Sequence, residues 1–175
     1  MGLQSVTLAP RFIFGVNGEI KNNLYIVEEK KLLYVVGHNV VIYNIDERSQ
    51  HFIPGSEGTE GINAISVSQS ARYLAICERG IERAQCMIYE IMAHKLRKVI
   101  PEVDQEVDYK CKEFLDVAFD PKSERNRLMT LCGEPDWCLL LWRWDDFKVM
   151  ARVDLSLFDP SLEGHFQLSF QNINT

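Results

Sequence analysis

The sequence lacks the features that would assign the chain to a membrane, to secretion or to a familiar class of enzyme. None of its apolar runs reaches the roughly 18 consecutive residues of a membrane-spanning helix. Residues 1–10 lack the basic cluster and long apolar stretch of a secretory signal. Gly-x-Ser-x-Gly, phosphate-loop and Gly-x-Gly-x-x-Gly sequences are absent as well. We therefore expect a chain that is not an enzyme, with no catalytic, cofactor-binding or metal-binding residues and no membrane contact.

An excess of positive charge is also missing. The 175 residues carry 19 Lys and Arg against 25 Asp and Glu, a net charge of −6. This balance argues against a protein that binds nucleic acid by neutralising phosphates. With 46% hydrophobic and 25% charged residues, the chain has an ordinary globular composition. We expect residues 1–175 to form one structural unit with a packed core.

Cysteines at metal-binding or disulfide spacings are not found. The chain has an odd number of cysteines and no Cys-x-x-Cys sequence. The five cysteines are Cys77, Cys86, Cys111, Cys132 and Cys138. Together with the missing secretory signal, they predict free thiols in a reducing, cytoplasmic compartment.

Short apolar runs rich in β-branched and aromatic residues dominate the chain, and turn residues separate them. The runs form three groups of four at about residues 24–53, 62–100 and 114–153, and a run at 165–170 begins a fourth group. Four short runs joined by tight polar turns predict an antiparallel meander. A further candidate strand is Arg11 to Phe14, of the kind that completes a last blade from the N-terminal side.

The groups are repeats of one pattern. In each group the third run ends in an aromatic residue followed by a polar one: Tyr43-Asn44, Tyr89-Glu90 and Trp142-Arg143. The aromatic residues are 46 and 53 residues apart, slightly more than the roughly 40–45 residues of WD repeats, which carry Trp-Asp at this place. Gly37-His38 lies inside a group, so we interpret it as a hairpin turn rather than the Gly-His pair of such a repeat.

The repeats predict an all-β WD-repeat β-propeller that is incomplete, with about three four-stranded blades and the start of a fourth. The continuous apolar runs Leu32–Val36 and Cys138–Leu141 suggest strands buried on both faces. The alternative is a β-sandwich or another meander of about twelve strands. Propellers close with about four to eight blades. Three blades would therefore leave two open faces, and we expect a fragment or short form that self-associates or packs against a partner.

The acidic segment after the second group is a candidate site. Its carboxylates alternate along the sequence: Glu102, Asp104, Glu106 and Asp108. The segment lacks the glycine and the late glutamate of a calcium loop. This favours a solvated loop between blades or, less strongly, a contact surface for a basic partner.

Other candidate residues fit structural roles better than chemical ones. Cys132, Cys138 and His165 lack zinc-ligand spacing, and cysteines on hairpin strands pack well in cores. The histidines are scattered: His38, His51, His94 and His165. Nucleic-acid bases could stack on tryptophans beside an arginine, but core packing is favoured for Trp137, Trp142 and Trp144 around Arg143. A basic patch on an outer strand could face an acidic microtubule surface and comprises Lys95, Arg97 and Lys98.

Several segments resemble the N-terminal propeller of the WD-repeat family of cilia- and flagella-associated protein 57. The most specific is Val41–Glu57, which contains Tyr-Asn and Phe-Ile-Pro-Gly-Ser-Glu. Shorter similar segments are Ala64–Ser68, Arg72–Ile76, Met87–Glu90, Arg97–Val99, Val117–Pro121, Lys148–Ala151 and Gln167–Phe170. The resemblance runs from about Phe12 to the C-terminus. It implies tandem propellers, a coiled coil and a structural role on axonemal microtubules in support of inner dynein arms, but a second propeller and a coiled coil are not present here.

We therefore predict a non-enzymatic scaffold of the motile-cilium axoneme that supports inner dynein arm assembly and ciliary motility. Its expected partners are axonemal proteins, including inner dynein arm components and tubulin, without cofactors, nucleic acid or membrane. The expected contact sites are the loops Gly55–Gly61, Glu78–Arg83 and Pro101–Lys112. One alternative is a WD-repeat adaptor outside the cilium, as a receptor or trafficking scaffold. A less favoured alternative is a propeller hydrolase that uses groups near the axis such as Asp116 and Asn63.

Overall fold

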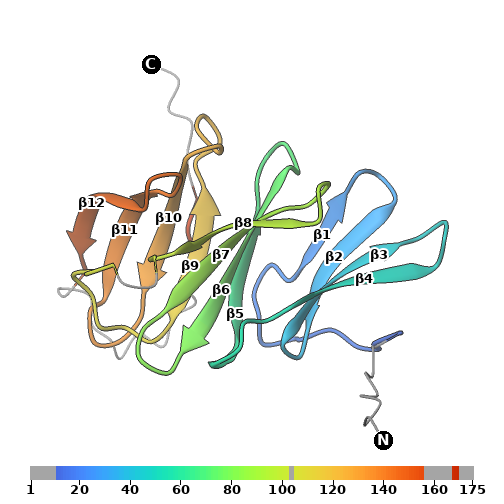
Figure 1. The fold of residues 1–175 in the computed structure, drawn as a ribbon, viewed down its shortest axis with the longest axis horizontal. Coiled ribbons are helices and arrows are strands. Elements are labelled where there is room, and N and C mark those ends of the chain that lie inside the picture. The colour runs from blue at the N-terminus through green and yellow to red at the C-terminus, as the bar shows by residue number, and fades with distance from the viewer. Residues whose placement is uncertain (1–10, 103–104, 156–166, 170–175) are drawn as a thin grey trace, which may run out of the picture.

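The computed structural model describes residues 11–102, 105–155 and 167–169, and every regular element in these residues is a β-strand (Figure 1). The first sheet contains β1 (Leu24–Val27), β2 (Lys31–Val36), β3 (Asn39–Asn44) and β4 (Ser49–Pro54). The second contains β5 (Thr59–Val67), β6 (Tyr73–Gly80), β7 (Gln85–Glu90) and β8 (Lys95–Ile100). The third contains β9 (Phe114–Phe119), β10 (Arg127–Cys132), β11 (Cys138–Arg143) and β12 (Lys148–Asp154).

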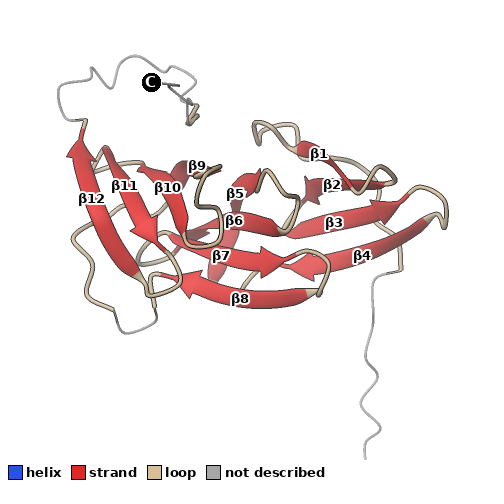
Figure 2. Ribbon diagram, turned by 90° about the horizontal axis from the view of Figure 1, so that it is seen from above, coloured by secondary structure: helices blue, strands red, loops and turns tan. Residues whose placement is uncertain are grey.

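Each sheet is an antiparallel meander in which every strand pairs with the next strand in sequence. Figure 2 shows the three sheets following one another, with β4, β8 and β12 along one edge of the array. This arrangement confirms the predicted all-β fold with three four-stranded blades, and the propeller is open rather than closed. Among the described residues, no helix is long and apolar enough to cross a membrane.

Strand alternation explains why the sheets stack. In β2 and β3 the side chains of Leu33, Val35, Val40 and Ile42 point to one face and are buried against the second sheet. The opposing side chains on the second sheet include Leu74 and Ile76 of β6 and Met87 and Tyr89 of β7. Burial of each Leu or Ile side chain contributes roughly 1.5–3 kcal/mol to folding, so this interface is a major source of stability.

A second core lies between the second and third sheets. The other face of the second sheet contributes Ala75, Cys77, Cys86 and Ile88, and the third sheet contributes Phe114, Leu128, Cys138, Leu140 and Trp142. All five cysteines are free and buried. Burial raises the pKa of the Cys77 and Cys138 thiols, so these side chains pack as small apolar groups.

The strands that are buried on both faces are β6 and β7 of the second sheet, and the prediction for two other runs was wrong. From Tyr73 to Cys77 every β6 side chain is buried. By contrast, Leu32–Val36 and Cys138–Leu141 alternate between buried and half-buried side chains. The first and third sheets each have a neighbouring sheet on one side only, so an apolar sequence alone does not bury their outward faces.

A tryptophan hydrogen bond fixes the third blade. Trp142 on β11 is fully buried and its Nε1 donates to the Thr130 Oγ1 on β10 at 2.9 Å. The ring also meets the Tyr109 ring edge-on, with centroids 6.2 Å apart. Tyr109 in turn donates its hydroxyl proton to the Ala84 backbone oxygen of the second blade at 3.0 Å. The aromatic residue of the repeat therefore joins two strands of its own blade and contacts a loop that reaches the preceding blade.

The two candidate strands outside the blades differ from expectation. Residues 11–16 form no strand. In the segment 165–170 only residues 167–169 are described, and these are not assigned to a strand; residues 165, 166 and 170 lie outside the described residues.

Gly37 occupies the predicted hairpin turn between β2 and β3 with a φ of 54°, a conformation that favours glycine.

Replacing Thr130 with Val should lower the free energy of unfolding by about 1–3 kcal/mol, because the Trp142 N–H would lose its acceptor inside the core. Urea denaturation followed by tryptophan fluorescence measures this change. Thr130→Ser keeps the hydroxyl and should lose less. Equal losses for the two variants would show that the hydrogen bond is unimportant.

Candidate interaction surface

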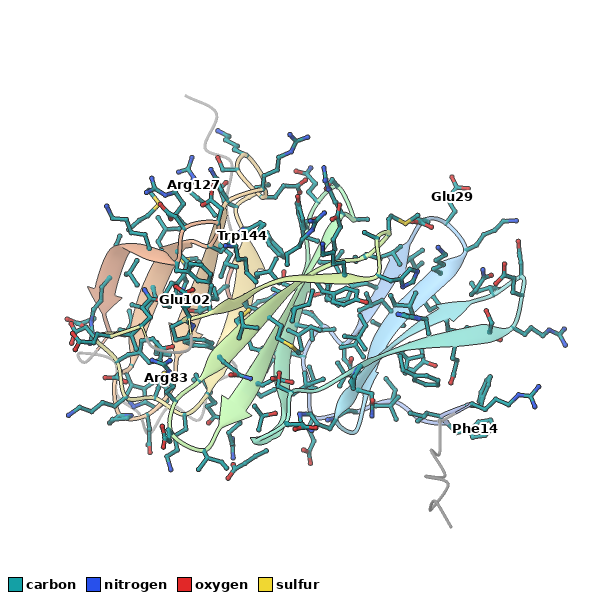
Figure 3. All side chains as sticks on the ribbon, in the orientation of Figure 1. Phe14, Glu29, Arg83, Glu102, Arg127 and Trp144 are labelled. Atoms are coloured by element: carbon teal, nitrogen blue, oxygen red, sulfur yellow. The ribbon has the colours of Figure 1, made fainter. Side chains whose placement is uncertain are left out.

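The loops predicted as contact sites share one edge of the structure, which we call the inter-blade rim. It contains the segments that join successive sheets (55–58 and 101–113) and the turns between second and third strands (37–38, 81–84 and 133–137). In an antiparallel meander these connections all fall at the same end of the strands. Figure 3 shows Arg83 toward this rim, whereas Glu29 and Arg127 lie toward the opposite edge.

The first inter-blade loop is held by a buried carboxylate. Glu78 on β6 has no exposed surface, and its Oε1 accepts the Ser56 N–H at 2.8 Å. Its Oε2 accepts from the Gln85 side chain at 2.8 Å. Buried carboxylates require such partners because an unpaired charge in a core is costly. Glu78 therefore locks the loop between the first two blades onto the second blade.

His38 reinforces the same loop. Its Nε2 lies 2.9 Å from the Thr59 Oγ1 and 3.5 Å from the Glu78 Oε1. A β-carbon at Gly55 would lie 2.1 Å from the His38 ring, so only glycine permits this approach. The prediction that His38 sits in a hairpin turn is confirmed, and the structure adds a contact with the inter-blade loop that sequence spacing did not reveal.

The second inter-blade loop is tied to both neighbouring blades. Arg83, in the β6–β7 turn, donates to the backbone oxygens of Gln105 at 2.7 Å and Glu102 at 2.9 Å. Gln105 donates through Nε2 to the Phe147 oxygen at 2.6 Å. Asp136, in the β10–β11 turn, accepts the N–H groups of Lys110 and Cys111, both at 2.6 Å. The acidic segment is thus a structured loop between blades, and Asp104 lies outside the described residues.

A polar cleft opens on the rim between the first two blades. It has a volume of about 630 Å³ and its lining includes Glu19, His38, Glu60, Asn63 and Arg79. The Arg79 side chain is already paired with Glu113, the last residue of the second inter-blade loop, with a hydrogen bond of 3.0 Å from Nε to Oε2. Acidic side chains therefore supply most of the uncompensated charge around the cleft.

The wider rim has the same acidic character. Among its described and exposed side chains, carboxylates outnumber basic groups. The exposed carboxylates of the rim are Glu57, Glu82, Glu102, Glu106, Asp108 and Glu134, and its exposed basic groups are Lys110 and Lys112. Glu60 and Arg79, at the adjoining ends of β5 and β6, are exposed as well. Such a surface favours an approaching protein surface of positive charge.

Two of the three basic side chains in the predicted patch already interact with other residues of the chain. Arg97 on β8 pairs with Glu90 of β7, which is buried and also bonded to Arg72 at 3.0 Å. The Lys98 ammonium lies 4.1 Å from the centre of the Phe147 ring, a cation–π contact with the third blade. Of the three basic residues, only Lys95 projects from β8 without a described partner. The patch therefore offers little free charge to an acidic microtubule surface.

The prediction of core packing is confirmed for the cysteines and for Trp142 and Trp144, whereas Trp137 is half-buried in the β10–β11 turn and belongs to neither core. Trp142 and Trp144 are buried, and the Trp144 indole donates to the Glu124 oxygen at 3.3 Å. Cys132 and Cys138 are buried in the second core, whereas His165 lies outside the described residues. Within residues 11–102, 105–155 and 167–169, no group of three or more His, Cys, Asp or Glu side chains is arranged to hold a metal ion.

The side chains of Asp116 and Asn63, which were expected near the propeller axis, form hydrogen bonds with backbone groups. Asp116 accepts the Leu168 N–H at 2.6 Å and the Val117 N–H at 2.8 Å. Burial raises the pKa of Asp116, and the two N–H groups oppose that shift. Asn63 donates through Nδ2 to the Phe114 oxygen, and its Oδ1 has no partner. Asn63 therefore links the second blade to the third, and Asp116 links the third blade to the segment 167–169.

Two histidines meet at the outer edge between the first two blades, a contact that sequence spacing did not reveal. The His51 and His94 rings lie with centroids 4.0 Å apart in an edge-to-face arrangement. Partial burial and the neighbouring His94 both lower the pKa of His51. The pair is consequently favoured when at least one ring is neutral.

Comparison with curated proteins gives relatives named for cilia and flagella, although no protein-family model matches the chain. The chain is 34% identical over 151 residues to cilia- and flagella-associated protein 57 of Mus musculus, covering 86% of this chain and 12% of that protein. It is 28% identical over 165 residues to cilia- and flagella-associated protein 57 C of Tetrahymena thermophila, covering 93% and 13%. Cilia- and flagella-associated protein 44 of Mus musculus is 27% identical over 140 residues, covering 80% and 7%. These similarities confirm the resemblance predicted from the sequence, and the chain spans only a small part of these relatives.

Comparison with solved structures supports the fold. The β-propeller domain of Cps50 (Swd1) from Myceliophteria thermophila matches 77% of this chain and 38% of that chain, with a TM-score of 0.53 and 14% sequence identity. At this identity the match concerns the fold alone. It agrees with the description of the three sheets as propeller blades.

Acidification should destabilise the wild-type chain through His51. The unfolded histidine binds a proton near its ordinary pKa of about 6.5, whereas the folded His51 resists protonation. The stability that neutral His51 contributes to the folded chain is therefore fully present above the ordinary pKa and is lost as the pH falls through the lower pKa of the folded residue. Thermal melts at pH 7.5 and pH 5.5 should show a smaller decrease in Tm for His51→Asn than for the wild type. An identical decrease in both proteins would contradict this assignment.

Proposed function

Starting from its homology with cilia- and flagella-associated protein 57, we propose that this chain is a non-enzymatic interaction module of the cilium or flagellum. Its relatives are named for association with cilia and flagella, which supports this location. The observation that carries the proposed mechanism is the inter-blade rim, where loops from all three blades are held in fixed positions. A rigid framework with structured loops at one edge is suited to contact with other proteins.

The charge of the rim suggests the chemistry of the partner. Exposed carboxylates outnumber basic groups on the rim, and Glu19 and Glu60 line a cleft whose arginine is already paired. A partner that presents lysine or arginine side chains would therefore gain favourable contacts. We propose that the rim binds basic surfaces of axonemal proteins, with inner dynein arm components as the first candidates. Tubulin is a weaker candidate for this rim, because its acidic surface would be repelled by it.

The proposed role requires no chemical step. The polar groups near the axis, Asp116 and Asn63, are engaged in hydrogen bonds that hold backbone segments. The relatives and the propeller fold also favour a structural role. Support for inner dynein arm assembly and ciliary motility is the finer part of the proposal.

Cross-linking and mass spectrometry of detergent-extracted axonemes from ciliated cells that express the tagged chain test this proposal. We expect the chain to remain in the axonemes, with cross-links from the inter-blade rim to axonemal proteins. A rim variant with Glu57, Glu82 and Glu134 each replaced by Lys should lose most of these cross-links, because its charge would repel a basic partner.

The matched control places the same charge change at the opposite edge, with Glu29, Glu47 and Asp145 each replaced by Lys. This control should keep the cross-links. Loss of cross-links in both variants would contradict the role of the rim. Absence of the chain from extracted axonemes would contradict the ciliary location and favour an adaptor elsewhere in the cell.

A further inference from the structure

The polar cleft between the first two blades has the size of a site for one long side chain of another protein. Its volume of about 630 Å³ lies within the roughly 300–1,000 Å³ of pockets that hold small ligands. Four segments line it: residues 17–20 before β1, the β2–β3 turn, the first half of β5 and the end of β6. The walls of the cleft are therefore supplied by the first two blades and the segment that leads into them.

Two isoleucines give the cleft an apolar floor. Ile20 and Ile62 line it, and each is only 6% exposed because both belong to the core between the first two sheets. The aliphatic stem of an arginine or lysine side chain packs on such a surface while its charged head stays among polar groups. A small inorganic cation would gain nothing from this floor.

The charged side chains of the cleft leave an excess of negative charge. Glu19 and Glu60 line it and are exposed. Arg79 is the only Lys or Arg among the described residues that line the cleft, and it donates to Glu113, which does not. That hydrogen bond raises the pKa of Arg79, and the nearby Glu60 adds to the shift. A cation that enters the cleft therefore meets two carboxylates, whereas the resident cation is already matched.

The neutral polar groups of the cleft wall include unused acceptors. The Thr59 hydroxyl donates to the Ser56 oxygen at 2.9 Å, so its own oxygen accepts from the His38 Nε2, also at 2.9 Å. The neutral His38 ring then has an acceptor at Nδ1. Asn63 donates through Nδ2 to the Phe114 oxygen, and its buried Oδ1 accepts no hydrogen bond within the described residues. A ligand that brings several N–H donors complements these groups.

We propose that the polar cleft receives a single arginine side chain of a partner protein. The stem packs on Ile20 and Ile62, and the guanidinium faces the carboxylates of Glu19 and Glu60. Arginine fits better than lysine because the acceptors belong to different segments, and a guanidinium presents five N–H groups in a rigid fork. This deepens the proposed function, on which it rests, by naming the group through which a basic partner is recognised.

An NMR titration of the purified, ¹⁵N-labelled chain with a short peptide that contains one arginine between alanines tests the proposal. The peptide should shift the amide signals of Gly37, Gly61 and Ile62, which line the cleft. A matched peptide with citrulline, which keeps the shape but lacks the charge, should bind about 10-fold more weakly. A lysine peptide should bind roughly 3-fold more weakly than the arginine peptide. Equal binding of the arginine peptide and either of the others would overturn the proposal.

Variants of the chain test the carboxylates. Replacing Glu19 and Glu60 together with Gln should weaken binding of the arginine peptide by about 10-fold and leave binding of the citrulline peptide unchanged. The matched control removes the same charge at the opposite edge, with Glu29 and Glu47 replaced by Gln, and should change binding by less than about 2-fold. Equal weakening in both double variants would show a general attraction to an acidic chain and would contradict the cleft as the site.

The outcome is separable from that of the ciliary role. An arginine peptide that does not bind, or that shifts amides away from the cleft, would overturn this proposal while the axonemal cross-links of the wild-type chain remained. Loss of those cross-links with an intact response to the arginine peptide would instead overturn the proposed function. The exposed positions of the substituted glutamates predict that all variants keep the dispersed NMR spectrum of the folded chain.

Discussion

The second sheet packs against a neighbouring sheet on each of its faces, and the rest of the structure depends on that double contact. A four-stranded meander has two broad faces and cannot bury both within itself. In this chain, Leu74 and Ile76 of β6 are buried toward the first sheet, and Ala75 and Cys77 are buried toward the third. The alternating residues of one strand therefore hold together two separate cores. The first and third sheets each gain one such interface, which explains why their outward faces are only partly covered.

Polar contacts fix the spacing of the blades where apolar packing alone would leave it free. The buried Glu78 and the Trp142–Thr130 hydrogen bond act inside the cores, and Arg83, Gln105 and Asp136 anchor the inter-blade loops. The contacts of Glu78, Arg83, Gln105 and Asp136 orient loops at the inter-blade rim relative to the sheets beneath them, whereas the Trp142–Thr130 hydrogen bond joins β10 to β11. The same interactions that maintain the blade stack thus hold the rim in a shape that another protein could recognise. The residues that stabilise the fold are therefore also the residues that would shape the proposed binding surface.

The sequence was sufficient to predict the blades, because strand alternation and the repeated aromatic-polar pairs are local signals. Tyr43, Tyr89 and Trp142 all lie on the third strand of their sheets, as the spacing indicated. Contacts between residues far apart in the chain were not predictable in the same way. The contact of Glu78 with the first inter-blade loop and the His51–His94 pair depend on how neighbouring blades face each other, and no spacing in the sequence encodes that. The apolar run Leu32–Val36 was misleading for the same reason, since its burial depends on a neighbour on the far side.

Hydrogen exchange followed by mass spectrometry tests the central claim most directly, because amides in strands covered on both sides open only with global unfolding. If the second sheet is the shared support of both cores, the amides of β6 and β7 should exchange most slowly in the chain. Those of β4 and β12, at the outer edge, should exchange much faster. Exchange in β6 as fast as in the outer strands would contradict the account.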